Sequence, residues 1–311
     1  MRTLICGSLA YDTIMVFPDR FENHILPDKI HILNVSFLVP QMRREFGGCA
    51  GNIAYNLDML GGEPVIMATV GEDFEPYAKR FERMQIDQTH VRRIADAYTA
   101  QAFITTDLDD NQITAFHPGA MNHSGLNHVQ DAAGIALGIV APDGRDGMLQ
   151  HAQEFADAGI PFLFDPGQGM PMFNGEELLR FLDLADYAAL NDYEAQLLQE
   201  RTGESLEYLA RRVKAMIVTL GAEGSMILAH GRRFSIPSVK PEAVVDPTGC
   251  GDAYRAGVLY GIANDLDWPV TGRLAALLGA MKIARRGGQN HFASRSQITD
   301  MFTEAFGSAP W

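Results

Sequence analysis

A glycine-rich turn between a predicted strand and a predicted helix is the part of this sequence best suited to phosphate chemistry. It reads Val244-Val245-Asp246-Pro247-Thr248-Gly249-Cys250-Gly251-Asp252-Ala253-Tyr254-Arg255-Ala256-Gly257. Gly249 and Gly251 let the backbone approach a ligand closely, and the free N–H groups of a helix that begins near Asp252 attract an anion. The Asp252 carboxylate would lie beside a bound phosphoryl group and could accept the proton of an attacking hydroxyl. The segment indicates phosphoryl transfer, although the same residues could form only a cap and a turn.

Nucleotide-binding motifs of other classes are missing from the sequence. No lysine completes a G-x-x-x-x-G-K-[ST] loop, no H-R-D catalytic loop occurs, and no G-x-G-x-x-G follows the first predicted strand. The three cysteines, Cys6, Cys49 and Cys250, lack the spacing of a zinc site or a redox pair. These absences exclude a P-loop enzyme, a protein kinase and a dinucleotide-binding fold.

The composition limits the partners of the chain. Its 311 residues carry 25 Lys and Arg against 39 Asp and Glu, a formal charge of −14, so no basic stripe for nucleic acid is available. No apolar stretch approaches the roughly 18 residues that a membrane span needs. Residues 1–8 read as a buried strand that ends in a Gly-Ser turn, not as a signal peptide. We expect a soluble protein in the cytoplasm, with its cysteines reduced.

The elements that must position the turn alternate between short apolar runs and amphipathic stretches. Strands are predicted at Ala136–Ala141, Pro161–Asp165, Tyr187–Asn191 and Ala215–Leu220, and helices at Gly147–Ala158 and Glu176–Ala185. This order predicts an α/β fold with a mostly parallel sheet covered by helices on both faces. Ligands of such sheets bind at the carboxyl ends of the strands.

Two segments, at about 13–46 and 92–117, differ from this alternation. The first holds three prolines and shows weak helical periodicity, and the second contains two alternating runs, Ala100–Thr106 and Gln112–Phe116, about an Asp109-Asp110-Asn111 turn. They could form a small β lid over the active site, or two unrelated surface hairpins. Nothing indicates an independently folded second domain, so residues 1–311 are predicted to form one unit.

The glycine-rich turn is similar to a signature of the ribokinase-like (PfkB) carbohydrate kinase family, D-T-x-G-x-G-D. Pro247 stands where that pattern most often has Thr. A second segment, Gly47-Gly48-Cys49-Ala50-Gly51-Asn52, is similar to the start of the family's other signature. A predicted helix, Gly61-Gly62, a predicted strand and Gly71-Glu72-Asp73-Phe74 follow it in the chain. The resemblance covers the whole chain and implies the family's three-layer sandwich with a small β lid.

The resemblance also implies roles for individual residues. Asp252 matches the catalytic base, and Gly249, Cys250 and Gly251 match the turn whose backbone amides form the anion hole for the γ-phosphate. Asp12 matches the carboxylate that holds two ribose or sugar hydroxyls, a task that suits an acceptor of several hydrogen bonds. The other substrate-binding candidates are Ser8, Gly47, Gly48 and Asn52.

The nucleotide and its ions are implied in the same way. Asn191-Asp192-Tyr193-Glu194 resembles the N-x-x-E motif that helps to place Mg²⁺ through water, although alone it reads as a helix start capped by Asn191. Thr219, Gly221 and Gly224 match the strand end and turn under ATP. Many members bind a monovalent cation such as K⁺ near the anion hole, and Asp246, Thr248 and the Gly287-Gly288-Gln289-Asn290 loop are the candidates here.

The acceptor is not fixed by the family, which phosphorylates ribose, fructose, other sugars and nucleosides. Phe164-Asp165-Pro166-Gly167-Gln168, residues 251–257 and the apolar run Ile32–Phe37 resemble the bacterial nucleoside kinases most. A nucleobase needs an apolar or aromatic surface, which Phe37 and Phe116 could supply unless both are ordinary hydrophobic residues of the lid or the core.

We therefore predict an ATP-dependent ribonucleoside kinase of adenosine-kinase type that acts on the 5′-hydroxyl and serves purine salvage. A sugar kinase such as a ribokinase or fructokinase is the alternative, and a non-catalytic nucleoside- or nucleotide-binding regulator is an alternative of another class. The sequence is compatible with a monomer and with a homodimer that pairs through the lid.

Overall fold

The central sheet is built from short apolar strands that pair mostly in parallel. This computed structural model describes residues 1–25, 34–109 and 111–309, and there the sheet follows the order β13-β12-β11-β10-β9-β8-β1-β4-β5. The bounds are β1 Arg2–Cys6, β4 Glu63–Val70, β5 Asp87–Arg93, β8 Leu137–Val140, β9 Phe162–Phe164, β10 Tyr187–Asn191, β11 Ala215–Thr219, β12 Ser225–Ala229 and β13 Arg232–Ile236. Neighbours from β5 to β11 are parallel, and β12 and β13 extend one edge in antiparallel pairing.

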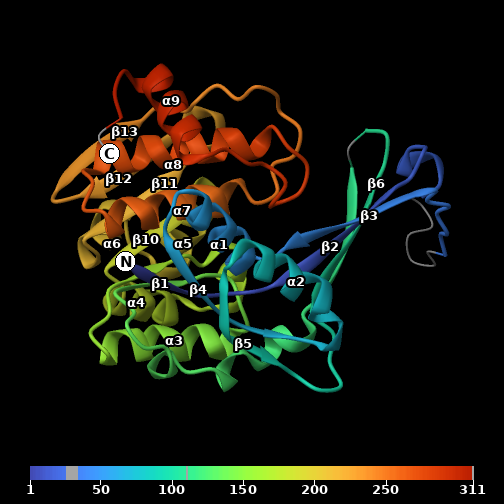
Figure 1. The fold of residues 1–311 in the computed structure, drawn as a ribbon, viewed down its shortest axis with the longest axis horizontal. Coiled ribbons are helices and arrows are strands. Elements are labelled where there is room, and N and C mark those ends of the chain that lie inside the picture. Colours follow the sequence, from blue (N-terminus) through green and yellow to red (C-terminus); the bar gives the residue numbers. More distant parts are fainter. Residues whose placement is uncertain (26–33, 110, 310–311) are drawn as a thin grey trace.

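Helices cover both faces of this sheet, because alternate strand residues are apolar on both sides. Ile5 of β1 belongs to one hydrophobic cluster, whereas its neighbours Leu4 and Cys6 belong to the other. The first cluster is covered by α1 Cys49–Met59, α2 Glu75–Met84, α7 Cys250–Ala263, α8 Trp268–Ile283 and α9 Arg295–Phe306, and the second by α3 Arg145–Asp157, α4 Gly175–Leu184, α5 Asp192–Thr202 and α6 Leu206–Leu209. The predicted three layers are present (Figure 1).

None of the helices in the described part of the chain combines the length and the apolar character that crossing a bilayer requires.

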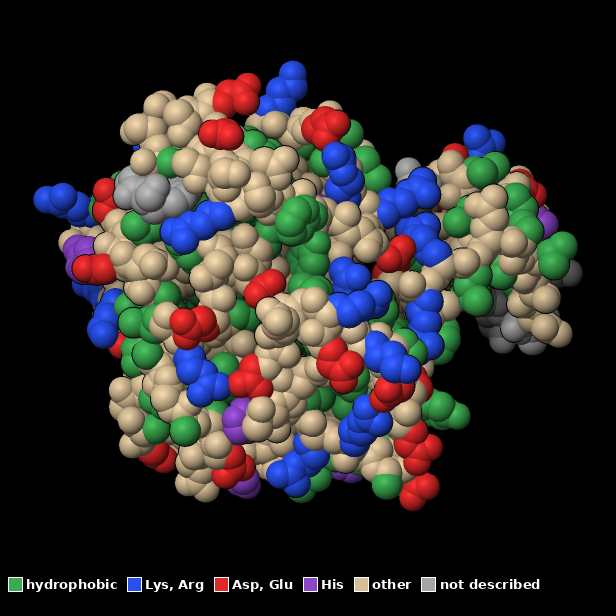
Figure 2. Space-filling model, viewed as in Figure 1, with side chains coloured by type: hydrophobic (Ala, Val, Ile, Leu, Met, Phe, Trp, Pro, Cys, Tyr) green, Lys and Arg blue, Asp and Glu red, His purple; other side chains and the backbone are tan. Residues whose placement is uncertain are grey.

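A second, smaller sheet projects away from the three-layer part of the molecule (Figure 1). Its order is β3-β2-β6-β7, with bounds β2 Ala10–Val16, β3 Gln41–Gly47, β6 Ala100–Thr106 and β7 Gln112–His117. Strand β2 follows β1 directly, so the main chain leaves the central sheet at its carboxyl edge and enters the small sheet there. Figure 2 shows hydrophobic side chains gathered on this projection, where Met42, Leu108 and Phe116 are exposed.

The structure places the boundaries of the two inserted segments differently from the sequence prediction. The small sheet begins at Ala10 instead of 13, and β5, which ends at Arg93, pairs with β4 in the central sheet. In the described residues of the first segment, 13–25 and 34–46, helical periodicity corresponds only to a short 3₁₀ turn, Phe21–Asn23. Periodicity is a weak guide in these strands because they carry polar residues on both faces. Ile32, Leu33 and Asp110 lie outside the described residues.

Close packing of α7 on α8 holds the start of one helix beside the end of the other. A Cβ atom at Gly257 would lie 2.5 Å from the Cα atom of Ala275, and one at Gly261 would lie 2.4 Å from Oγ1 of Thr271. Only glycine allows this approach of the two backbones. The spacing of the two helices therefore depends on these positions of α7.

Replacing Gly257 with valine is expected to destabilise the protein by about 1–3 kcal/mol, because the new side chain must push α8 away. Chemical denaturation measures the change. Gly279→Ala on α8 is the matched control: there a Cβ atom meets only the carbonyl oxygen of Cys250, at 3.8 Å. Alanine should be neutral or stabilising by up to about 1 kcal/mol at that position. Equal stability of the valine variant and the unaltered protein would contradict this account of the packing.

Candidate active site

The N-terminus of α7 exposes backbone donors. Gly249 precedes the helix with φ of 78°, a left-handed conformation that favours glycine, and no side chain caps the helix. The N–H of Cys250 donates to the carbonyl oxygen of Pro247 at 3.1 Å. Within the described residues, the N–H groups of Gly249, Gly251 and Asp252 have no acceptor. These donors and the helix dipole can bind an anion.

Asp246 fixes the shape of the turn that leads into this helix. One carboxylate oxygen accepts a hydrogen bond from the N–H of Thr248 at 2.9 Å, and the other accepts from the N–H of Gly287 at 2.8 Å. Burial acts to raise the pKa of Asp246, but these backbone donors outweigh it and hold the pKa below the usual value. The carboxylate thus joins the turn to the loop that follows α8.

The Asp252 side chain lies in the first turn of α7, partly buried. Burial raises its pKa to about 6, and the charge of Asp165 acts in the same direction. Asn52, Arg255 and the thiol of Cys49 oppose this rise. The hydrogen bond from Asn52 joins Nδ2 to Oδ2 of Asp252 at 2.8 Å. A carboxylate with this pKa is ionised at neutral pH and basic enough to accept a proton.

Asn52 is held by a buried network behind Asp252. Its Oδ1 accepts from Nε2 of Gln289 at 3.1 Å, and Gln289 also bonds the Tyr77 hydroxyl at 2.6 Å and Nε of Arg80 at 3.2 Å. A Cβ atom at Gly288 would lie 2.3 Å from Oδ1 of Asn52, so glycine is required there. In this structure the Asn52 amide contacts the proposed base and Gln289.

Asp12 of β2 lies across from the start of α1. A Cβ atom at Gly47 would be 2.5 Å from Oδ2 of Asp12, so the carboxylate packs on the bare glycine backbone. Burial raises the pKa of Asp12 to about 6, and the charges of Asp252, Asp246 and Glu45 add to the effect. The carboxylate of Asp252 is therefore close enough to affect the ionisation of Asp12.

Ser8 and Gly48 shape the start of α1. The Ser8 hydroxyl accepts from the N–H of Cys49 at 3.2 Å, and its carbonyl oxygen accepts from the N–H of Ala50 at 3.0 Å. Gly48 has φ of 85°, and a Cβ atom there would lie 2.5 Å from the Ser8 carbonyl oxygen. Both residues hold α1 against the end of β1.

A buried ionic cluster lies one helical turn beyond Asp252. Nη2 of Arg255 donates to Oδ1 of Asp165 at 3.1 Å and lies 3.8 Å from Oε2 of Glu194. Glu194 also forms a capping box with Asn191, whose side chain accepts from the N–H of Glu194 at 2.7 Å. Asn191 is thus a helix cap, and Glu194 is tied to both Asn191 and Arg255. Burial raises the pKa of Glu194.

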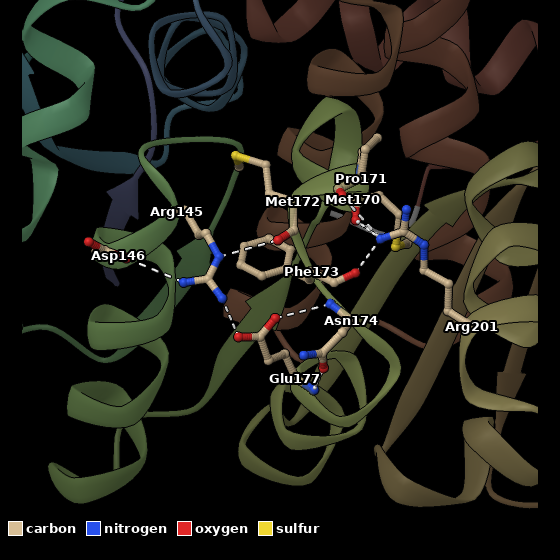
Figure 3. A network of polar contacts seen from close by, with 9 residues as sticks. All are labelled: Arg145, Asp146, Met170, Pro171, Met172, Phe173, Asn174, Glu177 and Arg201. Atoms are coloured by element: carbon tan, nitrogen blue, oxygen red, sulfur yellow. Dashed lines mark hydrogen bonds and ion pairs between the residues drawn. The ribbon is translucent and has the colours of Figure 1, made fainter.

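The chain that follows Asp165 is clamped by two arginines from neighbouring helices (Figure 3). Arg145 donates to the carbonyl oxygen of Met172 at 3.2 Å and pairs with Glu177. Arg201 donates to the carbonyl oxygens of Met170 and Pro171, both at 3.1 Å, and to that of Phe173. The clamp fixes this segment beside the ionic cluster.

The candidate ATP residues lie at strand ends on the same edge of the sheet. Asn191 and Thr219 are register partners at the ends of β10 and β11. Gly221 and Gly224 follow in a tight turn with φ of 57° and 93°, and a Cβ atom at Gly224 would lie 2.1 Å from the Ile236 carbonyl oxygen.

The two candidate aromatic residues occupy different places on the small sheet. Phe116 is 52% exposed, and through Ala102 it stands in the same register row as Asp12. Paired residues of neighbouring strands point to the same face, so Phe116 and Asp12 share a face. Phe37 packs on Phe17 and Phe21, with ring centroids 4.8 and 5.0 Å apart, in an aromatic cluster.

Several residues of this site had no role assigned from the sequence. Arg255 and Lys282 have a recognisable signal, since each is a charged residue inside an otherwise apolar helical run. Tyr77 and Arg80 have none, because their partners are distant in the sequence.

Replacing Asn52 with alanine is expected to raise the pKa of Asp252 from about 6 to above about 7. A hydrogen bond to a charged group contributes about 1.5–3 kcal/mol, and about 1.4 kcal/mol corresponds to one pKa unit. Carboxyl carbon NMR titration, assigned with an Asp252→Asn variant, measures the change. Asn290→Ala is the control, because that amide bonds Glu45 and a backbone oxygen instead. An unchanged pKa in Asn52→Ala would contradict the proposed support of Asp252.

Comparison with known proteins identifies the family and the fold of the chain. The sequence pattern of the family described as "pfkB family carbohydrate kinase" matches residues 9–295 of this chain. The structure of a Burkholderia thailandensis nucleoside kinase in complex with inosine has a TM-score of 0.91 and 53% identity, over 99% of both chains. The same protein in complex with ADP-inosine has a TM-score of 0.88 and 55% identity, over 99% of this chain and 97% of the other.

Two archaeal nucleoside kinases are also similar. That of Methanothermobacter thermautotrophicus is 30% identical over 304 residues, 96% of this chain and 98% of the relative. The structure from Methanocaldococcus jannaschii, described as a member of the ribokinase family, has a TM-score of 0.87 and 26% identity, over 98% of this chain and 99% of the other. The predicted fold class and family resemblance are thereby confirmed. The chain belongs to the pfkB family of carbohydrate kinases and has a ribokinase-like fold.

Proposed function

We propose that this chain transfers the γ-phosphoryl group of ATP to the 5′-hydroxyl of a purine ribonucleoside, with Asp252 as general base. One observation carries the proposal: a carboxylate with a raised pKa lies directly beside unpaired backbone donors at a helix start. Phosphoryl transfer needs a base for the attacking hydroxyl and fixed donors for the transferred group. The nucleoside kinases with similar sequences and structures support the choice of acceptor.

In the proposed mechanism, Asp12 accepts hydrogen bonds from the two ribose hydroxyls and so orients the 5′-hydroxyl toward Asp252. The 5′-oxygen forms a bond to the γ-phosphorus while the bond from that phosphorus to the bridging oxygen of ADP breaks. The hydroxyl proton passes to Asp252. The N–H groups of Gly249, Gly251 and Asp252 stabilise the charge on the transferring group. The product would be a nucleoside monophosphate, as purine salvage requires.

The face of the small sheet that carries Asp12 is a suitable surface for the nucleobase. Phe116 stands two strands from Asp12 on that face, roughly 10 Å away at the usual strand spacing of about 4.8 Å. A base linked to a ribose at Asp12 would reach this exposed ring across Ala102. Phe37 contributes to the aromatic cluster that keeps the small sheet in shape. Closure of the sheet as a lid would exclude water and limit ATP hydrolysis.

The ATP site would extend from α7 along the carboxyl edge of the sheet, past Asn191, Thr219, Gly221 and Gly224. A cavity of about 280 Å³ lies beside the C-terminal half of α8, with Val239, Leu277 and Phe292 in its walls. The apolar part of its lining suits the adenine ring, and Lys240, Glu242 and Arg285 also line the cavity.

Mg²⁺ would accompany the phosphates of ATP and neutralise their charge. Across the described parts of the chain, no three His, Cys, Asp or Glu side chains are grouped to hold a metal directly. This fits an ion held by phosphate and water, with Glu194 in the surrounding layer.

A screen of acceptors tests the proposed function. ADP release should be found with purine ribonucleosides and be far weaker with ribose or fructose. Asp252→Asn is expected to fold and bind nucleoside but to lose about 10²- to 10⁴-fold in turnover. Transfer by the unaltered protein should fall as the pH drops through about 6, because the base must be ionised. A preference for free sugars would favour the sugar kinase. Absence of transfer to any acceptor would favour a binding regulator, and normal turnover in Asp252→Asn would refute the assigned base.

Asp12→Ala is expected to raise the KM for the nucleoside by at least about 10- to 100-fold, because even one hydrogen bond to a carboxylate contributes about 1.5–3 kcal/mol. The KM for ATP should stay unchanged. Steady-state kinetics with each substrate varied measures both values. Asp109→Ala, an exposed aspartate that pairs with Arg20 far along the small sheet, serves as the control. An unchanged nucleoside KM in Asp12→Ala would remove the ribose-binding role.

A further inference from the structure

Asp246, one of the residues expected to bind a monovalent cation, is already engaged by other groups in this structure. Both carboxylate oxygens of Asp246 accept backbone N–H groups, from Thr248 and Gly287. The backbone oxygen of Asp246 accepts a hydrogen bond from Nζ of Lys282 at 2.7 Å. The oxygens of Asp246 that could ligate K⁺ are therefore occupied by donors, and one of these donors is itself cationic. As it stands, Asp246 does not fit the role of a K⁺ ligand.

Lys282 is buried to an unusual degree for a lysine. Its exposed fraction is 0%, and it lies in the last turn of α8. Nζ also donates to the carbonyl oxygen of Arg285, at 3.1 Å. A lysine is rarely buried so fully unless its charge is compensated. Here the ammonium group joins the turn before α7 to the chain after α8.

The surroundings of Nζ compensate a positive charge. Its two acceptors are carbonyl oxygens, and it lies at the C-terminal, negative end of the α8 dipole. The carbonyl oxygen of Ile283 in that last turn accepts from the N–H groups of Val245 and Asp246, so the same helix end holds the turn directly. Burial lowers the pKa of Lys282, but the nearby Cys250, Asp246 and Asp252 oppose this change.

We propose that the ammonium group of Lys282 is a built-in cation, which holds the anion-hole turn in place of K⁺ and makes the reaction independent of monovalent cations. The inference rests on the proposed kinase function, and Lys282 acts in it as a positioning residue. Asp246, Gly249 and Asp252 lie on one short stretch of chain, so a shift of the Asp246 carbonyl group moves both the backbone donors and the base. Misplacement of about 1 Å in such a site can cost about 10²-fold in rate.

The test compares Lys282→Met with the unaltered protein in buffer whose only monovalent cation is tetramethylammonium. The unaltered protein should turn over equally with and without added K⁺. Lys282→Met should lose about 10²-fold in kcat without K⁺, at an unchanged nucleoside KM, and should recover much of it when K⁺ or NH₄⁺ is added. Lys214→Met, at the opposite end of the sheet, is the control, because this exposed lysine pairs with Asp186. Thermal unfolding establishes that both variants are folded.

A second readout does not depend on turnover. Crystals grown with RbCl should show no anomalous density beside the carbonyl oxygens of Asp246 and Arg285 in the unaltered protein, and a bound ion there in Lys282→Met. If Lys282→Met fails to fold, the K⁺ dependence and the rubidium density of the unaltered protein decide whether the inference holds. A requirement for K⁺ or bound rubidium in the unaltered protein contradicts the inference. The inference is also contradicted if Lys282→Met folds and has a normal kcat, or if it folds and its loss of kcat is not restored by K⁺ or NH₄⁺. Absence of any transfer by the unaltered protein refutes the kinase function instead, and the rubidium result then decides the inference separately.

Discussion

The N-terminus of α7 imposes the main physical constraint on this protein, because unpaired backbone donors and a carboxylate share one turn. The donors attract an anion, whereas the charge of Asp252 repels it. A raised pKa for Asp252 reduces this conflict, and in the proposed mechanism the carboxylate would take up the proton of the attacking hydroxyl at little cost. The left-handed backbone at Gly249, the hydrogen bonds of Asp246 and the amide of Asn52 all serve to keep donors and carboxylate side by side.

The charges around the turn follow from the same constraint. In the proposed function, the polyphosphate of ATP would bind near five carboxylates, those of Asp12, Asp165, Glu194, Asp246 and Asp252. Arg255 and Lys282 lie buried on the protein side of the turn and offset part of this negative charge. In the proposed function, the remaining balance comes from Mg²⁺ bound to ATP. This arrangement explains how a chain with a formal charge of −14 can still bind an anionic nucleotide at one place.

Local sequence patterns were sufficient to predict the central sheet and the turn at α7, whereas the roles of the individual site residues rest on the family resemblance and stay predictions. Apolar runs alternating with helical stretches predicted the parallel sheet, and glycine spacing predicted the turn at α7, because both depend on neighbours in the chain. The supporting contacts could not be predicted in this way. Gln289 meets Asn52 across 237 positions, and Arg255 meets Asp165 across 90, so only the folded chain brings them together. The last two residues of β5, Arg92 and Arg93, were assigned to the inserted segment, because the polar residues of this strand hide its pairing with β4.

The account is tested most directly by a crystal structure of the protein with ADP, aluminium fluoride as a mimic of the transferring phosphoryl group, and inosine. It predicts that the fluoride ligands accept hydrogen bonds from the N–H groups of Gly249, Gly251 and Asp252. A carboxylate oxygen of Asp252 should lie within about 3 Å of the 5′-oxygen of the nucleoside. A mimic bound away from the start of α7, or an Asp252 side chain turned from the 5′-oxygen, would contradict the central claim.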